Sequence, residues 1–281
     1  MIALTGATGQ LGQFVVEELL KTVAAKQIVA IVRNPAKAEA LSKQGVLVRQ
    51  ADYGDQAALT QALAGVDKLL LISSSEVGQR AAQHRNVINA AKAAGVKFIA
   101  YTSLLHADKS PLGLHVEHVE TEKMLAESGI PYALLRNGWY SENYLASAPA
   151  ALAHGVFIGA AGDGKIASAT RADYAAAAAR VISEEGHAGK VYELAGDNGW
   201  TLSELAALLS KASGKNIVYQ NLSEADFAAA LKGAGLPDVF ANLLADSDAG
   251  AAKGGLFDDS KTLSKLIGRP TTPIADSVNA L

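Results

Sequence analysis

The N-terminal stretch of this chain constrains its fold more than any other part of the sequence. A short apolar run at residues 2–5 leads directly into the glycine-rich segment 6–12, which reads Gly-Ala-Thr-Gly-Gln-Leu-Gly. From Leu11 to Lys21 apolar residues recur at helical spacing, which predicts a helix. A strand, a glycine-rich turn and a helix in this order are typical of a unit that binds a dinucleotide.

Each glycine of this segment has a physical role in such a unit. Gly6 permits a tight turn out of the strand, and Gly9 has no Cβ to obstruct a pyrophosphate. Gly12 allows the helix to pack closely against the strand. The first turn of the helix then offers free N–H groups and a positive dipole to the phosphates. A glycine turn without a ligand is the alternative, and the flanking strand and helix favour binding.

Strand and helix patterns alternate through the first half of the chain. Apolar or β-branched runs predict strands at residues 2–5, 28–32, 46–48, 69–72, 98–101 and 132–135. Helical patterns lie between them at residues 11–21, 36–44, 56–64, 79–94 and 116–128. This alternation predicts an α/β fold with a doubly wound parallel sheet, the Rossmann arrangement.

The second half predicts a smaller, mostly helical part. Strands are expected at residues 191–194 and 217–219, and helices at 201–212, 223–231 and 239–244. Thr201 and Glu204 have the spacing of a capping box, Asp173 resembles an N-cap before an alanine run, and residues 246–255 resemble a loop. We therefore expect a dinucleotide-binding Rossmann domain at 1–150 and a substrate-side domain at 151–281. The boundary is approximate, because the chain is expected to cross between the two.

The residue that follows the second predicted strand bears on the choice of cofactor. Folds specific for NAD place an acidic residue there, which accepts hydrogen bonds from the ribose hydroxyls. This chain has Arg33 instead, in the segment Ile31-Val32-Arg33-Asn34. A carboxylate would repel a 2′-phosphate, whereas an arginine can pair with it through two hydrogen bonds. Arg33 therefore predicts a preference for NADPH over NADH. The alternative is that Arg33 is only a solvated charge at the end of a strand.

A second pair of residues near this position has two interpretations. Asp52 and Tyr53 follow the third predicted strand and suit the adenine side of a cofactor pocket. Asp52-Tyr53-Gly54-Asp55 is equally a good turn sequence. The sequence does not decide between these interpretations.

Composition excludes several classes of protein. The chain has no cysteine, so disulfides, thiolate metal sites and thiol catalysis are ruled out. Its net charge of −3 gives no sign of a nucleic-acid or membrane-binding surface, and no apolar run reaches the length of a membrane-spanning helix. The six histidines do not have a metal-binding spacing, so no metal is expected. A cytoplasmic protein without a signal peptide is the expectation; oligomeric state is not predicted.

Several segments together resemble a known family. The glycine segment, residues 31–34, the segment 71–78 (Leu-Ile-Ser-Ser-Ser-Glu-Val-Gly), Asp163-Gly164-Lys165 and the stretch 136–143 (Arg-Asn-Gly-Trp-Tyr-Ser-Glu-Asn) are similar to the atypical short-chain dehydrogenases related to the regulator NmrA. The resemblance covers essentially the whole chain. Within that family the chain most resembles the bacterial NADPH-dependent quinone reductases, and the triphenylmethane dye reductases are more distant.

The resemblance implies positions for the cofactor NADP(H), all at the carboxyl ends of strands or close to them. The pyrophosphate would be held by Gly6, Ala7, Thr8, Gly9, Gln10 and Leu11, the 2′-phosphate by Arg33, and the ribose and pyrophosphate by Ser73, Ser74 and Ser75. The nicotinamide and the acceptor would face Asn137, Gly138, Trp139, Tyr140, Ser141, Glu142 and Asn143, with Asn143 as the catalytic candidate.

Each of these assignments has a structural alternative. Arg171 approaches the cofactor or is a surface charge. The three serines could form an ordinary solvated loop, and Trp139 with Tyr140 could be core packing. The amide of Asn143 could have a purely structural role.

The general short-chain dehydrogenase pattern fails at one position. Ser103 and Lys123 could be the serine and lysine of that pattern, but Val119 stands where the tyrosine of Tyr-x-x-x-Lys belongs. Ser103 could equally be a hydroxyl bonded to the local backbone, and Lys123 a solvated helix residue or a ribose ligand. The missing acid matters for a ketone, whose reduction creates a strongly basic alkoxide. It matters less for a quinone, whose reduction creates a far weaker base.

Two classes of function therefore remain for this sequence. The first is an enzyme that transfers a hydride from NADPH to a small-molecule quinone, with a dye reductase as the enzymatic alternative. The second is a regulator that senses NADP(H) without turnover. The missing tyrosine is compatible with both, and the resemblance around residues 137–144 favours the enzyme.

Overall fold

The computed structural model describes all residues from 1 to 281. Its strands are β1 (Ile2–Thr5), β2 (Ile28–Val32), β3 (Leu47–Gln50), β4 (Lys68–Leu71), β5 (Phe98–Leu104), β6 (Tyr132–Asn137), β7 (Val156–Gly159), β8 (Val191–Leu194) and β9 (Val218–Asn221). Its α-helices are α1 (Gln10–Leu20), α2 (Glu39–Lys43), α3 (Gln56–Ala62), α4 (Arg80–Ala93), α5 (His115–Ser128), α6 (Ser141–Leu145), α7 (Ala148–His154), α8 (Arg171–Ser183), α9 (Leu202–Ser213), α10 (Glu224–Gly233), α11 (Asp238–Ala252), α12 (Thr262–Ile267) and α13 (Ile274–Asn279). Two short 3₁₀ helices, η1 (Ala25–Gln27) and η2 (Pro35–Ala38), flank β2.

Residue contacts divide the chain into two compact units. The first unit consists of residues 1–104, 116–137 and 171–192, and the second of residues 105–115, 138–170 and 193–281. The chain therefore enters each unit more than once. The predicted division into functional domains near residue 150 stays a prediction.

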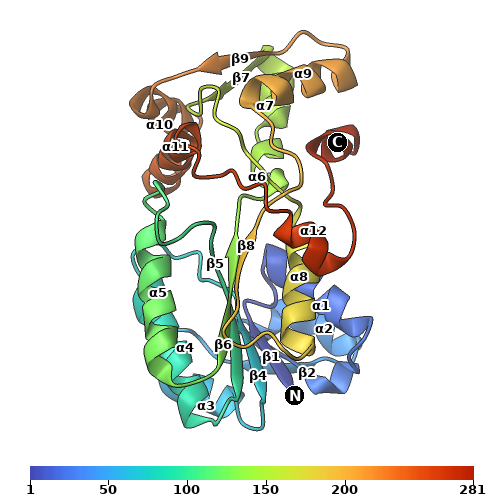
Figure 1. Ribbon diagram of the computed structural model, residues 1–281, viewed down its shortest axis with the longest axis vertical. Helices are drawn as coiled ribbons and strands as arrows, with labels where there is room; N and C mark the ends of the chain where they lie inside the picture. Colours follow the sequence, from blue (N-terminus) through green and yellow to red (C-terminus); the bar gives the residue numbers. More distant parts are fainter. The chain divides into compact units, whose positions relative to one another are not determined.

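The sheet has the strand order β3-β2-β1-β4-β5-β6-β8. β1 pairs in parallel with β2 and with β4, and β5 continues the parallel pairing to β6. In the first unit, α3, α4 and α5 cover one face of the sheet, and α1 and α8 lie on the other (Figure 1). This is the predicted doubly wound α/β fold, and the seven strands are those of a Rossmann-like sheet.

Burial explains why the strands read as continuous apolar runs. Every residue of β2 and of β5 is buried, because helices cover both faces of the sheet. The core between the sheet and the helices α3, α4 and α5 is built mainly from leucine, isoleucine, valine and alanine, with Tyr101 as a fully buried aromatic residue. This core holds the carboxyl ends of the strands in fixed positions.

The strand order also locates the expected binding edge. The order reverses at β1, which has β2 on one side and β4 on the other. In open α/β sheets a ligand binds outside the carboxyl ends of the strands at such a reversal. The loops that follow β1 and β4 are the glycine segment and the segment that begins at Ser73, so both predicted cofactor segments meet this edge of the first unit.

The second unit contains the parallel pair β7 and β9 together with several helices (Figure 1). Thr201 and Glu204 form the predicted capping box at the start of α9, with both reciprocal hydrogen bonds present. The α10 and α11 helices pack against each other. The prediction of a mostly helical part is confirmed here, although β7 and the helices α6, α7, α12 and α13 were not predicted.

The prediction of a loop at residues 246–255 is wrong for residues 246–252, because α11 continues through Ala252, and correct for residues 253–255. The small and polar residues that suggested a loop serve close packing and hydrogen bonding. Asp246 accepts a hydrogen bond from the Gly113 N–H at 2.8 Å, and Asp248 accepts one from the Ala160 N–H at 2.9 Å. A Cβ on Gly250 would lie only 2.7 Å from the Leu112 side chain, so glycine permits this contact.

Two smaller predictions are also wrong. Residues 36–44 do not form one helix, since η2 begins at Pro35 and α2 begins only at Glu39; the Asn34 side chain accepts a hydrogen bond from the Ala36 N–H at this start. Asp173 is not an N-cap, because α8 begins two residues earlier and buries Asp173 in its first turn. None of the helices combines the length and the apolar character that crossing a membrane requires.

Candidate cofactor and active site

The glycine segment has the geometry that a phosphate group requires. Gly6 adopts a left-handed conformation with φ of +64°, which turns the chain out of β1. Gly9 donates its N–H to the Gly6 carbonyl at 2.9 Å and is the N-cap of α1. No side chain caps this end of α1 and no acidic residue lies in its first turn, so the N–H groups there are not taken by a cap.

Gly12 is required for a contact that differs from the predicted one. A Cβ at this position would lie 2.2 Å from the Gly6 carbonyl oxygen and 2.8 Å from the Ala7 Cα. The residue therefore packs α1 against the glycine segment itself. At Gly9 a Cβ would meet only the Gly6 carbonyl oxygen, at 3.1 Å, so there the demand for glycine is much weaker within the chain.

The three serines after β4 differ in their surroundings. The Ser73 N–H donates to Thr102 Oγ1 at 2.8 Å, which fixes the loop to β5. Ser74 is buried, and its Oγ accepts a hydrogen bond from the Glu76 N–H at 3.2 Å. Ser75 is exposed. The alternative of an ordinary solvated loop therefore describes Ser75 and not Ser74, and the role of the three serines toward the cofactor stays a prediction.

A buried histidine holds the loop after β4 through a hydrogen bond. His84 on α4 accepts a hydrogen bond from the Ser74 N–H at its Nε2 atom, at 3.0 Å. Its Nδ1 must then carry the proton and donate to Thr121 Oγ1, also at 3.0 Å. Burial, aided by the charge of Arg80, lowers the pKa of His84 from 6.5 to about 3. The imidazole is neutral, and it positions the main chain of the loop.

Arg33 is already engaged by carboxylates in the structure. Its Nη1 atom donates to Glu76 Oε1 at 2.6 Å, and its Nε atom lies 3.9 Å from Asp52 Oδ2. The second oxygen of Glu76 accepts a hydrogen bond from Gln83 Nε2 at 2.7 Å. The Arg33 side chain is 63% exposed, so it remains accessible from solvent. Both interpretations of Arg33, a ligand of the 2′-phosphate and a solvated charge at the end of a strand, therefore stay predictions.

The turn at Asp52 is present in the structure. Asp52 Oδ1 accepts a hydrogen bond from the Gly54 N–H at 2.7 Å. The Tyr53 hydroxyl donates to the Ile72 carbonyl at 2.8 Å, and burial raises the pKa of Tyr53 to about 12. Tyr53 thus ties the loop after β3 to the end of β4. A role on the adenine side of the pocket stays a prediction.

Asn137 carries an unsatisfied polar atom at the end of β6. The residue is 5% exposed, and its Oδ1 has no hydrogen-bond partner within the chain. A buried amide oxygen without a donor is costly, so such an atom is normally satisfied by a ligand or by water. Together with the uncapped end of α1, this orphaned acceptor fits a bound dinucleotide at the carboxyl edge of the sheet.

Residues 138–143 belong to the second unit and are held there by a separate set of contacts. The Ser141 hydroxyl lies 2.8 Å from the Ser168 hydroxyl, which also accepts a hydrogen bond from Trp200 Nε1 at 3.2 Å. Trp139 is partly buried, so it is not a fully enclosed core residue. Asn143 lies in α6, where its N–H donates to the Tyr140 carbonyl at 3.1 Å. The prediction that these residues face a nicotinamide stays a prediction.

Ser103 is held in a polar network within the first unit. Its hydroxyl donates to Glu122 Oε1 at 2.6 Å, and Arg136 binds both oxygens of Glu122, at 3.0 and 2.7 Å. The interpretation of Ser103 as a hydroxyl bonded to the local backbone is therefore wrong, because its partner is the Glu122 carboxylate. Lys123 is 75% exposed and lies 4.0 Å from Glu127. The structure thus shows Ser103 and Lys123 in these structural contacts.

Arg171 is the first residue of α8, the helix that packs against α1 in the first unit. Its side chain is partly buried, and its approach to a cofactor stays a prediction.

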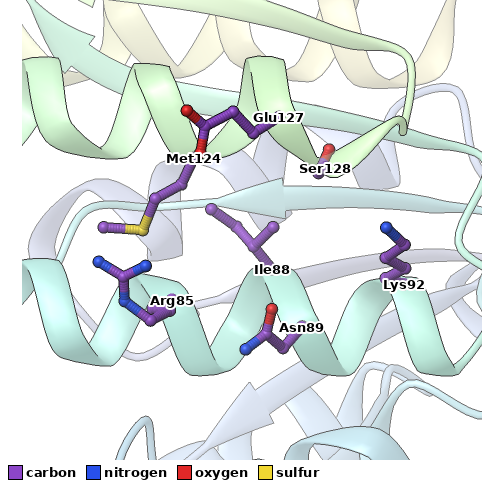
Figure 2. Close-up of a pocket in the computed structure, with 7 residues that line it drawn as sticks. All are labelled: Arg85, Ile88, Asn89, Lys92, Met124, Glu127 and Ser128. Carbon is purple, nitrogen blue, oxygen red and sulfur yellow. The ribbon is translucent and has the colours of Figure 1, made fainter.

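A separate pocket lies between α4 and α5 (Figure 2). None of the predicted cofactor residues lines it. Its lining residues are Arg85, Ile88, Asn89, Lys92, Met124, Glu127 and Ser128.

The fold and the site define a class of protein: a dinucleotide-binding α/β protein with a phosphate loop after β1. A model of the NmrA-like family matches residues 1–269. The chain belongs to the NmrA-like family.

Named relatives narrow the comparison further. The chain is 82% identical over its full length to Quinone oxidoreductase 2 of Escherichia coli, of which it covers 98%. It matches the crystal structure of an NADPH-dependent quinone oxidoreductase from E. coli in complex with NADPH, with a TM-score of 0.98, 81% identity and coverage of 100% and 99% of the two chains. A Citrobacter triphenylmethane reductase complexed with NADP(H) is 43% identical, with a TM-score of 0.95 and coverage of 100% and 99%.

Sequence reasoning missed the residues that surround the predicted cofactor contacts. Glu76, Gln83 and His84 all hold the loop after β4 or the arginine beside it. Glu76 lies within the segment that resembles the family, but no sequence signal pairs it with a distant arginine. His84 lies on a predicted helix, where a lone histidine has no distinctive pattern.

Proposed function

We propose that this chain is a cytoplasmic, atypical short-chain dehydrogenase/reductase that reduces a quinone with NADPH. The observation that carries this function is the 82% identity to Quinone oxidoreductase 2 over the full length of the chain. The uncapped end of α1 and the unsatisfied oxygen of Asn137 support a bound dinucleotide independently of that identity.

The residues of the first unit have the following roles in this proposal. Gly6, Ala7, Thr8, Gly9, Gln10 and Leu11 hold the pyrophosphate through main-chain N–H groups and the dipole of α1. Arg33 pairs with the 2′-phosphate through charge-assisted hydrogen bonds. Ser73, Ser74 and Ser75 line the ribose and pyrophosphate, on a loop that Thr102 and His84 hold in place.

The remaining residues act at the reacting end. Asn137 accepts a hydrogen bond through its unsatisfied oxygen, and Asn143 orients the nicotinamide or the acceptor through its amide. Trp139 and Tyr140 contribute apolar surface for a flat acceptor. When bound, NADPH supplies a hydride, and these residues bind and orient the reactants.

The contacts of Ser103 and Lys123 agree with an acceptor that needs no proton donor from the protein. A quinone that accepts a hydride becomes a hydroquinone monoanion, a weak base that takes its proton from water. A ketone would become an alkoxide, a strong base that needs a positioned proton donor nearby. With Ser103 bonded to Glu122 and a valine in place of the tyrosine, the quinone is the better match.

The test is steady oxidation of NADPH by the purified protein with several benzoquinones and naphthoquinones. We expect turnover with quinones that exceeds turnover with a triarylmethane dye. Faster reduction of the dye would favour the second candidate, a dye reductase, which the 43% identity to the Citrobacter triphenylmethane reductase supports. Tight NADPH binding without turnover of any acceptor would favour a cofactor-sensing regulator.

A further inference from the structure

Arg33 and Glu76 form a close ion pair at the place where the 2′-phosphate would bind. We infer that Glu76 is a specificity-determining residue that weakens the binding of cofactors with a 2′-phosphate, because it competes for Arg33. The inference rests on the proposed role of Arg33 and adds to it an opposing group. Glu76 lies on the loop after β4, and Arg33 follows β2.

A second hydrogen bond, made by the other oxygen of the carboxylate, holds Glu76 near the guanidinium of Arg33. Its Oε1 accepts from Arg33 at 2.6 Å, while its Oε2 accepts from Gln83 Nε2 at 2.7 Å. Its own N–H donates to Ser74 Oγ, which fixes the main chain as well. Because α4 and the loop both hold Glu76, the carboxylate stays close to Arg33 even when the guanidinium turns toward another anion.

The local charge is unfavourable for a phosphate. Asp52 lies 3.9 Å from Arg33 on the Nε side, so two carboxylates surround a single guanidinium. A 2′-phosphate must therefore displace Glu76 from Arg33 or bind beside it. In the first case an ion pair is lost, and in the second the phosphate and Glu76 repel each other. NADH has neither cost, and its free 2′-hydroxyl could donate to the Glu76 carboxylate.

The experiment compares Glu76→Gln with the wild type in direct titrations of NADPH, NADP⁺ and NADH, without any acceptor. Glutamine keeps the shape and can still accept from Arg33, but it has no charge. Because the pair is exposed and partly screened, we expect NADPH and NADP⁺ to bind about 2- to 5-fold more tightly. NADH should bind equally or slightly less tightly, and release of NADP⁺ should slow by about the factor by which binding tightens.

Glu120→Gln is the matched control. Glu120 on α5 pairs with Arg85 at 3.1 Å, and this exposed pair also loses one negative charge. It should leave all three cofactors unchanged. Equal tightening in both variants would mean that net charge alone is responsible, and would overturn the inference. Unchanged or weaker NADPH binding in Glu76→Gln would also overturn it, because Glu76 would then only orient Arg33.

The variant Arg33→Ala tests the premise, that Arg33 binds the 2′-phosphate, separately from the inference that Glu76 competes for Arg33. If Arg33→Ala weakens NADPH selectively while Glu76→Gln has no effect, Arg33 binds the phosphate and the inference about Glu76 is wrong. If neither variant changes the preference for NADPH, Arg33 does not hold the phosphate and both statements are wrong. The titrations contain no quinone, so their results do not depend on the proposed acceptor.

Discussion

Replacement of Arg33 by alanine tests the basis of NADPH preference most directly. A guanidinium that pairs with the 2′-phosphate makes charge-assisted hydrogen bonds, which contribute about 1.5–3 kcal/mol. Binding also breaks or weakens the existing pair with Glu76. That pair is exposed on both sides, so its loss costs only about 0–1 kcal/mol.

The difference gives the expected magnitude. A net contribution of about 0.5–3 kcal/mol corresponds to a loss of NADPH affinity of about 2- to 150-fold in Arg33→Ala. NADH, which has no 2′-phosphate, should bind almost as before. Arg33→Asp should go further, because a third carboxylate beside Asp52 and Glu76 repels the phosphate and accepts bonds from free ribose hydroxyls. High salt should narrow the wild-type preference, because Arg33 is largely exposed.

The assay is kcat/KM for NADPH and NADH at a fixed quinone concentration, supported by direct titration of both cofactors. Arg85→Ala is the control, because Arg85 is also an exposed arginine in an ion pair with a glutamate. An equal loss for both cofactors in Arg33→Ala, or no loss for either, would refute the reasoning. Arg33 would then be part of a surface ion pair without a role in cofactor choice.

The other predictions concern the phosphate loop, the acceptor and the buried histidine. Gly9→Val should largely abolish NADPH binding in fluorescence titration while thermal unfolding stays near wild type, whereas Gly12→Ala should also lower the unfolding temperature, because its Cβ would lie 2.2 Å from a main-chain oxygen. Asn143→Ala should lower kcat with quinone more than it weakens NADPH binding; unchanged kcat and KM would remove Asn143 from the active site. His84 has a lowered pKa, so its contribution to stability is present above about pH 6.5 and is lost as the pH falls toward 3. Urea unfolding should show a loss of about 2 kcal/mol between about pH 7 and about pH 5 that is absent in His84→Gln, and identical pH profiles would contradict this.

The sequence predicts the sheet of the first unit well for a physical reason. Strands buried on both faces are continuously apolar, and the helices between them are bounded by glycine, so pattern and burial agree. β1 and β2 have the predicted limits, and β5 is longer than predicted because it continues through polar residues that are nevertheless buried. Thr102 and Ser103 look like loop residues, and only the Ser73 loop and Glu122 explain their burial.

The second unit is predicted less well, because its packing depends on contacts between distant segments. Residues 246–252 have a loop-like composition, yet they are helical because Gly113, Ala160 and Leu112 meet them. No local pattern encodes these partners. The same reason explains why the partners of Arg33 could not be predicted: the arginine is local to β2, whereas Glu76 comes from the loop after β4.

The arrangement around Arg33 suggests why an enzyme of this kind would retain an acid beside its phosphate ligand. Both the substrate NADPH and the product NADP⁺ carry the 2′-phosphate, so tighter binding at Arg33 stabilises both and does not by itself lower the barrier between them. Stronger binding of the product slows its release, which often limits turnover. A carboxylate that competes for Arg33 reduces the affinity for NADPH and for NADP⁺ by the same factor. Arg33 can still distinguish the 2′-phosphate of NADPH from the 2′-hydroxyl of NADH. Selectivity between NADPH and NADH and fast release of NADP⁺ then depend on two neighbouring residues of opposite charge, Arg33 and Glu76.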